Sequence, residues 1–341
     1  MTTMTERGRK GRFGWRGMAH AVLFVGVFLF IYHNESKMHS LNMGIEDIVG
    51  SSTTTTTTLG QLDVVVSEEE LYRLAREESF GFFDNIPQDE WLRRKLIAQS
   101  RNHFPAHKQA APNRRHRYWP GDWHSYNWEV DFSCDAEDTV GGIRDGRKWV
   151  CDPHRLNREG CLVYSIGSNG DFTFEVGIQK LAPLCEIHTF DFRDYSSDMV
   201  KWGVNGTFHA NGLKPSYESW ENRTGTKTNA RFGKPPKRFE NKQRTMAQIQ
   251  KELGHEGRRI DIFKIDCEGC EWKSYLDWIR LDIQQILVEL HETPPAAHEI
   301  LTEMHQQGYV IFHKEPNAEW AGGNCVEYSF LKLSTNFTQG H

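Results

Sequence analysis

The chain has 341 residues, of which 38% are hydrophobic, so it is long enough for one large domain with appended segments. Its 41 lysines and arginines nearly balance its 46 aspartates and glutamates. This balance argues against a nucleic acid or another acidic polymer as the partner of the whole molecule.

The first 33 residues have the pattern of a signal anchor. Residues 1–17 form a basic tail, and residues 18–33 contain the apolar run AVLFVGVFLFIY. The positive-inside rule places the tail in the cytosol and the rest of the chain across the membrane. The run is shorter than the roughly 20 residues of a typical span, which thin early-secretory membranes tolerate. We expect a single-pass type II membrane protein whose main domain lies in the lumen of the Golgi or the endoplasmic reticulum.

Cleavage after the apolar run would instead give a secreted protein. The run shows no small-x-small cleavage pattern at its end, which favours an uncleaved anchor. Residues 34–66 are predicted to form a threonine-rich stalk, either glycosylated or a plain spacer. Seven cysteines fit an oxidising compartment and disulfide bonds. Four N-x-S/T sequons, which are typical of a lumenal glycoprotein, occur at Asn34, Asn205, Asn222 and Asn336.

Residues 67–158 are predicted to form an N-terminal cap of helices and irregular chain. Ser67 followed by three glutamates is a typical helix start, and a second short helix begins at Asp89. The stretch 113–128 mixes arginines with aromatic residues, as nucleic-acid-binding segments do. Behind a signal anchor the same mixture suits a sugar, or simply packs on the main domain. We therefore predict no nucleic-acid partner and keep a glycan as a candidate ligand.

Residues 159–341 alternate between strand and helix patterns. Such alternation favours a mostly parallel sheet with helices on both faces. Two consecutive strands at the end of the chain predict an antiparallel pair or edge. Strands are expected at 161–167, 185–192, 206–210, 259–266, 284–291, 308–315 and 324–333, and helices at 172–182, 245–255, 268–279 and 294–308.

Two cysteines begin the first two of these strands. Cys161 lies as far before Gly167 as Cys185 lies before Asp191. If the two strands are neighbours in register, the two sulfur atoms lie side by side. We therefore predict a Cys161–Cys185 disulfide.

A glycine turn, Gly167-Ser168-Asn169-Gly170, directly follows the first of these strands and precedes a helix. Glycines allow close approach of the backbone to a ligand, and the helix N-terminus offers unpaired N–H groups. The pattern is neither the dinucleotide fingerprint nor a P-loop, so NAD and P-loop chemistry are excluded. Asp191 ends the next strand at a spacing typical of a ribose-binding acid. The alternatives are Asp194 in that role, or a simple surface acid.

A charged cluster follows the buried strand at 259–266. Asp266 stands at the carboxyl end of this strand, where open α/β sheets place their sites, and Glu268 follows it. Asp266 is the best candidate for contact with the charged end of a cofactor or with the acceptor. His291 ends the next strand, so parallel neighbours would bring it toward Asp266, where it could act as a general base. The intervening C-x-x-C of Cys267 and Cys270 has no matching ligand pair, which favours a disulfide or buried thiols over zinc. No metal site is predicted.

These blocks resemble those of FkbM-type methyltransferases, and particularly of the methyltransferase-like protein 24 family. The resemblance runs from about Trp149 to Leu333 and rests on VYSIGSNGDFTFE, EIHTFDF, IDIFKIDCEGCEW and QILVELHE. It implies an α/β fold with a Rossmann-like, seven-stranded, mostly parallel sheet that binds S-adenosylmethionine. By position, Gly167 to Gly170 match the family's glycine motif, Asp191 its ribose-binding acid and Asp266 the acid after the fourth strand.

The chain departs from the family pattern at two positions. Ser165 stands where class members often have an acid, for which Asp171 is a substitute. Phe192 follows Asp191 where related blocks more often have proline.

The resemblance and the anchor together predict a methyltransferase that transfers a methyl group from S-adenosylmethionine to a hydroxyl or carboxyl oxygen. Asp266, His291 and Glu268 are the candidate catalytic residues. The lumenal setting favours a glycan or glycoconjugate acceptor. Two alternatives stay open: a metal-independent glycosyltransferase, since the chain has no D-x-D motif, and a non-catalytic binding or scaffold protein with the same fold.

Overall fold

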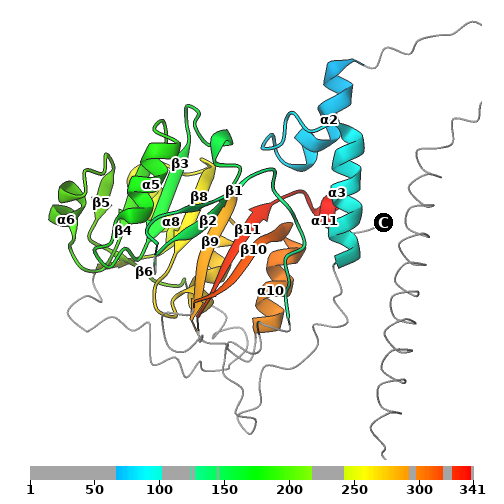
Figure 1. The fold of residues 1–341 in the computed structure, drawn as a ribbon. Coiled ribbons are helices and arrows are strands. Elements are labelled where there is room, and N and C mark those ends of the chain that lie inside the picture. The colour runs from blue at the N-terminus through cyan, green and yellow to red at the C-terminus, as the bar shows by residue number, and fades with distance from the viewer. Residues whose placement is uncertain are drawn as a thin grey trace, which may run out of the picture. The chain divides into compact units, whose positions relative to one another are not determined.

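A seven-stranded sheet forms the centre of the computed structural model (Figure 1). The strand order is β10-β11-β9-β8-β3-β4-β5, and β11 alone runs against the other six strands. The predicted mostly parallel sheet with an antiparallel pair at its end is therefore confirmed. The strands are β3 (Leu162–Ile166), β4 (Glu186–Phe190), β5 (Thr207–His209), β8 (Ile260–Ile265), β9 (Ile283–His291), β10 (Tyr309–Asn317) and β11 (Cys325–Lys332).

The structure describes residues 67–101, 124, 127–143, 146–216, 242–291, 297–317 and 325–338. The predicted basic tail, signal anchor and stalk lie outside these ranges, as does most of the stretch 113–128. Among the helices of the described residues, none combines the length and the apolar character needed to cross a membrane. The described residues belong to one unit, Val66–His341, and its predicted division at residue 158 stays a prediction.

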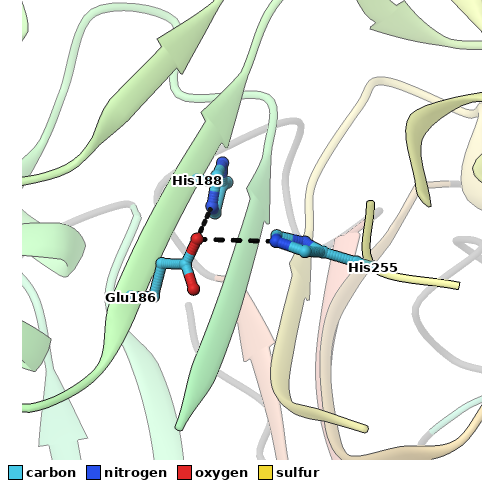
Figure 2. A group of neighbouring side chains, drawn as sticks. All are labelled: Glu186, His188 and His255. Carbon is cyan, nitrogen blue, oxygen red and sulfur yellow. Dashed lines mark hydrogen bonds and ion pairs between the residues drawn. The ribbon is translucent and has the colours of Figure 1, made fainter. Parts of the chain in front are cut away.

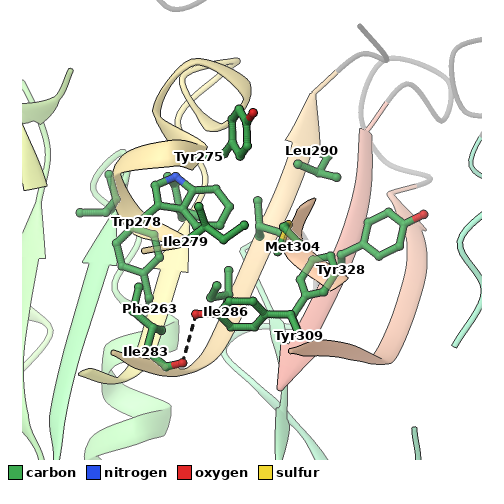
Figure 3. Close-up of a cluster of buried hydrophobic side chains, with 14 of the residues drawn as sticks. Phe263, Tyr275, Trp278, Ile279, Ile283, Ile286, Leu290, Met304, Tyr309 and Tyr328 are labelled. Carbon is green, nitrogen blue, oxygen red and sulfur yellow. Dashed lines mark hydrogen bonds between the residues drawn. The ribbon is translucent and has the colours of Figure 1, made fainter. Parts of the chain in front are cut away.

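Helices and buried side chains cover both faces of the sheet. Consecutive residues of a strand face opposite sides, so Phe263 and Ile262 of β8 belong to different buried clusters. The cluster of Phe263 includes side chains of α8 (Met246–Leu253), α9 (Glu271–Trp278) and α10 (Ala297–Gln306), as Figure 3 shows for Trp278 and Met304. The cluster of Ile262 includes Ile178 of α5 (Thr173–Leu181).

Local sequence explains where these elements begin and end. Every residue of β3 and β8 is buried, as expected for central strands of a parallel sheet with continuous apolar runs. Helix α8 begins with a capping box between Thr245 and Gln248 and ends at Gly254, whose φ of 70° suits a glycine.

The predicted cap contains the two expected helices and a small sheet that the prediction missed. Helices α2 (Glu68–Glu78) and α3 (Gln88–Arg101) meet where the Trp91 Nε1–H donates to Glu78 at 2.6 Å. The expected irregular chain instead contains β1 (Glu137–Val140) and β2 (Lys148–Cys151), paired antiparallel. Strands of four residues are too short to show a recognisable alternation of polar and apolar side chains. The remaining elements are η1 (Pro153–Arg155), α6 (Ser196–Lys201), β6 (Gly212–Leu213), β7 (Gln243–Arg244) and α11 (Thr335–Thr338).

Three disulfides connect six of the seven cysteines. Cys161 and Cys185 are bonded, because Leu162 of β3 pairs with Glu186 of β4 and the preceding residues lie opposite each other. The predicted pair is therefore confirmed. The others are Cys134–Cys151 and Cys267–Cys270, and Cys325 is buried without a disulfide.

Candidate active site

The glycine turn lies directly against the end of β8. Gly167, Asn169 and Gly170 all have positive φ angles, of 80°, 47° and 83°. A Cβ atom on Gly167 would stand 1.7 Å from the carbonyl oxygen of Asp266. Only glycine permits this approach, so the turn and the end of β8 form one surface at the carboxyl edge of the sheet.

Asp191 lies beside this turn at the end of β4. One carboxylate oxygen accepts the Asn169 backbone N–H at 3.0 Å, and the other accepts the Arg193 N–H at 2.9 Å. Burial raises the pKa of Asp191, while these two bonds oppose the rise. Each oxygen keeps a further lone pair that can accept a ribose hydroxyl. Ser168 is also nearly buried. The bond from Asn169 to Asp191 joins the turn of Gly167, Ser168, Asn169 and Gly170 to Asp191, so these predicted cofactor residues lie together.

Beneath the turn lies a buried acid that the sequence reasoning missed. The Lys264 ammonium donates to the Gly167 carbonyl at 2.9 Å, and the Thr189 hydroxyl donates to Glu175 at 3.2 Å. Burial raises the pKa of Glu175, and the Lys264 charge and the hydroxyls of Ser165 and Thr189 oppose that rise. Helix α5 thus places a carboxyl group near Ser165, the position at which the family pattern often has an acid.

Asp171 has a different part in this region. Its carboxylate accepts the Thr173 backbone N–H at 2.8 Å and so caps the start of α5.

A signal for Glu175 existed in the sequence: it is an acid three residues before Ile178, on the buried face of an amphipathic helix.

Asp266 and His291 come together as predicted from neighbouring strands. The Asp266 Oδ1 and His291 Nε2 atoms are 3.8 Å apart. Burial opposes ionisation of Asp266, but the charges of Lys148, Lys264 and His291 outweigh it and lower its pKa. Asp266 is therefore a carboxylate at neutral pH.

His291 is held in its charged form. Its Nδ1 lies 3.1 Å from Oε1 of the fully buried Glu271. Burial lowers the pKa of His291, but hydrogen bonds to Cys325 and Glu271 outweigh this and raise it to about 12. A protonated imidazole has no lone pair for a second proton. The protonation of His291 thus disfavours its predicted role as a base and leaves Asp266 as the candidate proton acceptor.

Glu268 stands at the outer side of this pair, in a fixed turn. Its side chain is 70% exposed, with Oε2 3.7 Å from His291 Nε2. Glu271 accepts the backbone N–H groups of Cys267 at 2.6 Å and Gly269 at 2.7 Å. These bonds and the Cys267–Cys270 disulfide fix the turn. Glu268 is therefore placed to meet a ligand from solvent, and its catalytic role stays a prediction.

A buried lysine from β2 enters the same cluster. Lys148 donates to Glu327 at 2.7 Å and lies 3.7 Å from Asp266 and 3.8 Å from Glu289. Burial opposes the charge of Lys148, but these three acids outweigh it and raise its pKa. The prediction missed Lys148 because it treated this segment as irregular, although a lysine directly before the apolar residues Trp149, Val150 and Cys151 is a detectable signal.

Glu289 and Glu327 complete the cluster. Burial, together with the charges of Asp266 and Glu327, raises the pKa of Glu289. In its protonated form Glu289 can donate a hydrogen bond to Asp266. Asp266, Glu271 and His291 could each offer one ligand atom to a metal ion. Lys148 and the protonated His291 already supply positive charge here, so the arrangement suits an organic ligand better.

Comparison with known families agrees with this arrangement. A family model described as a methyltransferase domain matches residues 73–332, most of the chain. The chain belongs to this methyltransferase family. Membership of this family supports S-adenosylmethionine as the cofactor.

A curated human relative of this methyltransferase is named as a probable methyltransferase-like protein 24. It is 25% identical over 182 residues, which cover 47% of this chain and 44% of that protein. The methyltransferase thus aligns with less than half of its relative's length.

Solved structures of methyltransferases also match, at low identity. An rRNA methylase from Streptococcus thermophilus is 9% identical, covers 53% of this chain and 92% of its own, and has a TM-score of 0.31. A 1,6-didemethyltoxoflavin-N1-methyltransferase from Burkholderia thailandensis, with S-adenosylhomocysteine bound, is 10% identical, covers 51% and 72%, and has a TM-score of 0.29.

Proposed function

We propose that this methyltransferase acts on a hydroxyl or carboxyl oxygen of an acceptor in the secretory pathway. One observation carries the proposal: the carboxyl ends of β3, β4, β8 and β9 bring the glycine turn, Asp191, Asp266 and His291 to one edge of the sheet. In open α/β sheets ligands bind at this edge. The glycan class of acceptor and the lumenal Golgi or endoplasmic-reticulum location follow from the predicted signal anchor and belong to the same proposal.

The residues present fit the donor. The Asp191 carboxylate suits two ribose hydroxyls, and the glycine turn that precedes α5 allows a ligand to approach the backbone closely. S-adenosylmethionine supplies an electrophilic methyl group on a sulfonium sulfur when bound. Asp191 and the glycine turn would hold its nucleoside, and Asp266 would face the reacting end.

The chain's own contribution is orientation and proton acceptance. A hydroxyl acceptor must align in line with the methyl carbon and lose its proton as the new oxygen–carbon bond forms. Asp266, ionised and held by Lys148 and Lys264, accepts that proton or orients the hydroxyl. The charge of His291 stabilises Asp266 in this form and can attract an anionic acceptor. A carboxylate acceptor would need no base at all.

Calorimetric titration of the full chain with S-adenosylmethionine tests the proposal. We expect micromolar binding by the wild type and at least a tenfold loss in Asp191→Ala, about 1.4 kcal/mol. Asp194→Ala is the matched control, because Asp194 is an exposed neighbour that only caps Ser196 and should leave affinity unchanged. Absence of binding by folded, disulfide-intact wild type would overturn the proposal.

A methyl-transfer assay tests the proposed activity and the proposed class of acceptor. Labelled donor should label a lumenal glycan or glycoconjugate with the wild type. Asp266→Asn should lower the rate by about 10²–10⁴-fold while donor affinity changes far less. Binding without transfer to any secretory acceptor would instead favour the non-catalytic alternative.

A further inference from the structure

A second group of potential ligands lies at the opposite end of β4 from Asp191. Glu186 and His188 are two residues apart on β4 and share one face of the sheet, and His255 follows α8 (Figure 2). We call Glu186, His188 and His255 the imidazole cluster. Glu186 begins the strand and Asp191 follows its end, about 16 Å away at the rise of a β-strand. The imidazole cluster is therefore separate from the candidate active site.

The ligand atoms of the cluster converge on one point. Glu186 Oε1 lies 2.8 Å from His188 Nε2 and 3.5 Å from His255 Nε2 (Figure 2). All three atoms lie within 4.8 Å of one another. Around a tetrahedral zinc ion, with bonds of about 2.0–2.1 Å to nitrogen and oxygen, ligand atoms are about 3.3 Å apart. Side-chain shifts of ångström size or less therefore suffice to close the site around an ion.

Both imidazoles are held through their other ring nitrogen. His188 Nδ1 lies 2.8 Å from Nε2 of His209, and His255 Nδ1 lies 2.8 Å from the Tyr164 hydroxyl. Histidines that bind metals almost always have such a partner, which fixes the tautomer and the ring direction. In both residues the nitrogen left facing the cluster is Nε2.

Burial and backbone anchoring add rigidity. The side chains of His188 and His255 are nearly buried, whereas that of Glu186 is 45% exposed. The His255 backbone N–H donates to Gln250 at 2.8 Å, so the end of α8 positions the ring. Two fixed imidazoles and one carboxylate that faces solvent leave an open direction for a water ligand.

Arg258 competes for part of the cluster. Its guanidinium donates to Glu186 Oε2 at 2.6 Å and to His255 Nε2 at 3.3 Å, the nitrogen that an ion would also use. Glu186 Oε1 is the oxygen that faces both histidines, so Arg258 and an ion can use different oxygens of the carboxylate. At His255 Nε2 an ion must displace the Arg258 hydrogen bond. The positive charge of Arg258 nevertheless weakens the binding of any cation nearby.

We propose that Glu186 Oε1, His188 Nε2 and His255 Nε2 bind a divalent first-row transition ion, zinc in the first instance, with a water in the fourth position. Imidazole and carboxylate ligands in this number are those zinc takes in open sites. Binding would tie the start of β4 to the connection between α8 and β8, and so stabilise the end of the sheet opposite the active site.

Titration of the chelator-stripped full chain with cobalt(II) alone tests the proposal. One equivalent should give the visible absorption of a tetrahedral cobalt site, and zinc should displace it. His188→Gln and His255→Gln should each abolish the signal. His154→Gln, which changes an exposed histidine outside the cluster, should leave it unchanged.

A fourth variant separates a metal site from a purely structural polar cluster. Arg258→Gln should bind the ion several-fold more tightly, because a competing charge is gone, although it removes a bond of the folded protein. Zinc should also raise the melting temperature of the wild type but not of the folded His188→Gln protein. The proposal is overturned if the stripped wild type binds no cobalt, or if folded His188→Gln and His255→Gln bind it like the wild type.

Discussion

Single residues at the carboxyl edge of the sheet carry charges that the rest of the site controls. Glu175 is the clearest case, since it is a buried acid whose nearest charge is the Lys264 ammonium under the glycine turn. Glu175→Gln keeps the size of the side chain and removes the ionisable carboxyl group. We expect the affinity for S-adenosylmethionine to fall several-fold, because the Lys264 ammonium, which donates to the Gly167 carbonyl under the turn, loses a nearby acid, with a change in unfolding free energy of about 1–3 kcal/mol.

Calorimetry and urea unfolding measure the two effects of Glu175→Gln separately. Glu159→Gln, at an exposed glutamate, is the control. Unchanged donor affinity in Glu175→Gln would show that Glu175 only fills space beneath the turn.

His291 makes a pH-dependent contribution to stability. Its pKa in the folded protein is raised to about 12, above the ordinary value of about 6.5. The contribution is therefore complete below about pH 6.5 and is lost progressively as the pH rises toward the folded value. We expect the advantage of the wild type over His291→Gln to be about 1–3 kcal/mol larger at pH 6 than at pH 9. Urea unfolding of both proteins at the two pH values measures it, and parallel pH profiles would contradict it.

At the scale of elements, the turn between β3 and α5 depends on contact with β8. Gly167→Ala combines a positive φ with a collision against Asp266, whereas Gly160→Ala has a similar φ of 78° and an open environment. We expect Gly160→Ala to cost about 1 kcal/mol and Gly167→Ala to cost several more, with loss of donor binding. Urea unfolding gives both values. Equal losses of unfolding free energy in the two variants would show that the backbone at Asp266 shifts easily to make room for the added methyl group.

The elements of the sheet were predictable because their patterns are strong. The buried runs of β3 and β8 and the helical spacing of α8 each have one dominant interpretation. Strands β1 and β2 could not be predicted, because four residues of mixed polarity show no periodic pattern. Their positions also depend on residues that are distant in sequence. The same limit applies to the site: Asp191, Asp266 and His291 end predictable strands, whereas Lys148 reaches the site because the β2 backbone is bonded by side chains of β9 and β11, which are distant in sequence.

At the scale of the whole molecule, N-glycosylation tests the predicted lumenal orientation of the main domain. The sequons at Asn205 and Asn336 lie in the described chain, and both asparagines are exposed. In secretory cells, Asn205→Gln and Asn336→Gln should each remove one glycan, seen as a step in mass that enzymatic deglycosylation abolishes. Asn157→Gln, at an exposed asparagine without a sequon, should leave the mass step unchanged. An unglycosylated wild type would contradict the lumenal orientation.

The position of Lys148 decides how short this enzyme can be made. A chain trimmed to residues 159–341 would keep every strand of the seven-stranded sheet but lose the ammonium that lies among Asp266, Glu289 and Glu327. The three acids would then face one another without their principal counter-charge, and mutual repulsion would drive protons onto them at neutral pH. The trimmed chain would lack an intact candidate site, so the shortest chain that keeps this site must include the β1–β2 hairpin upstream of the sheet.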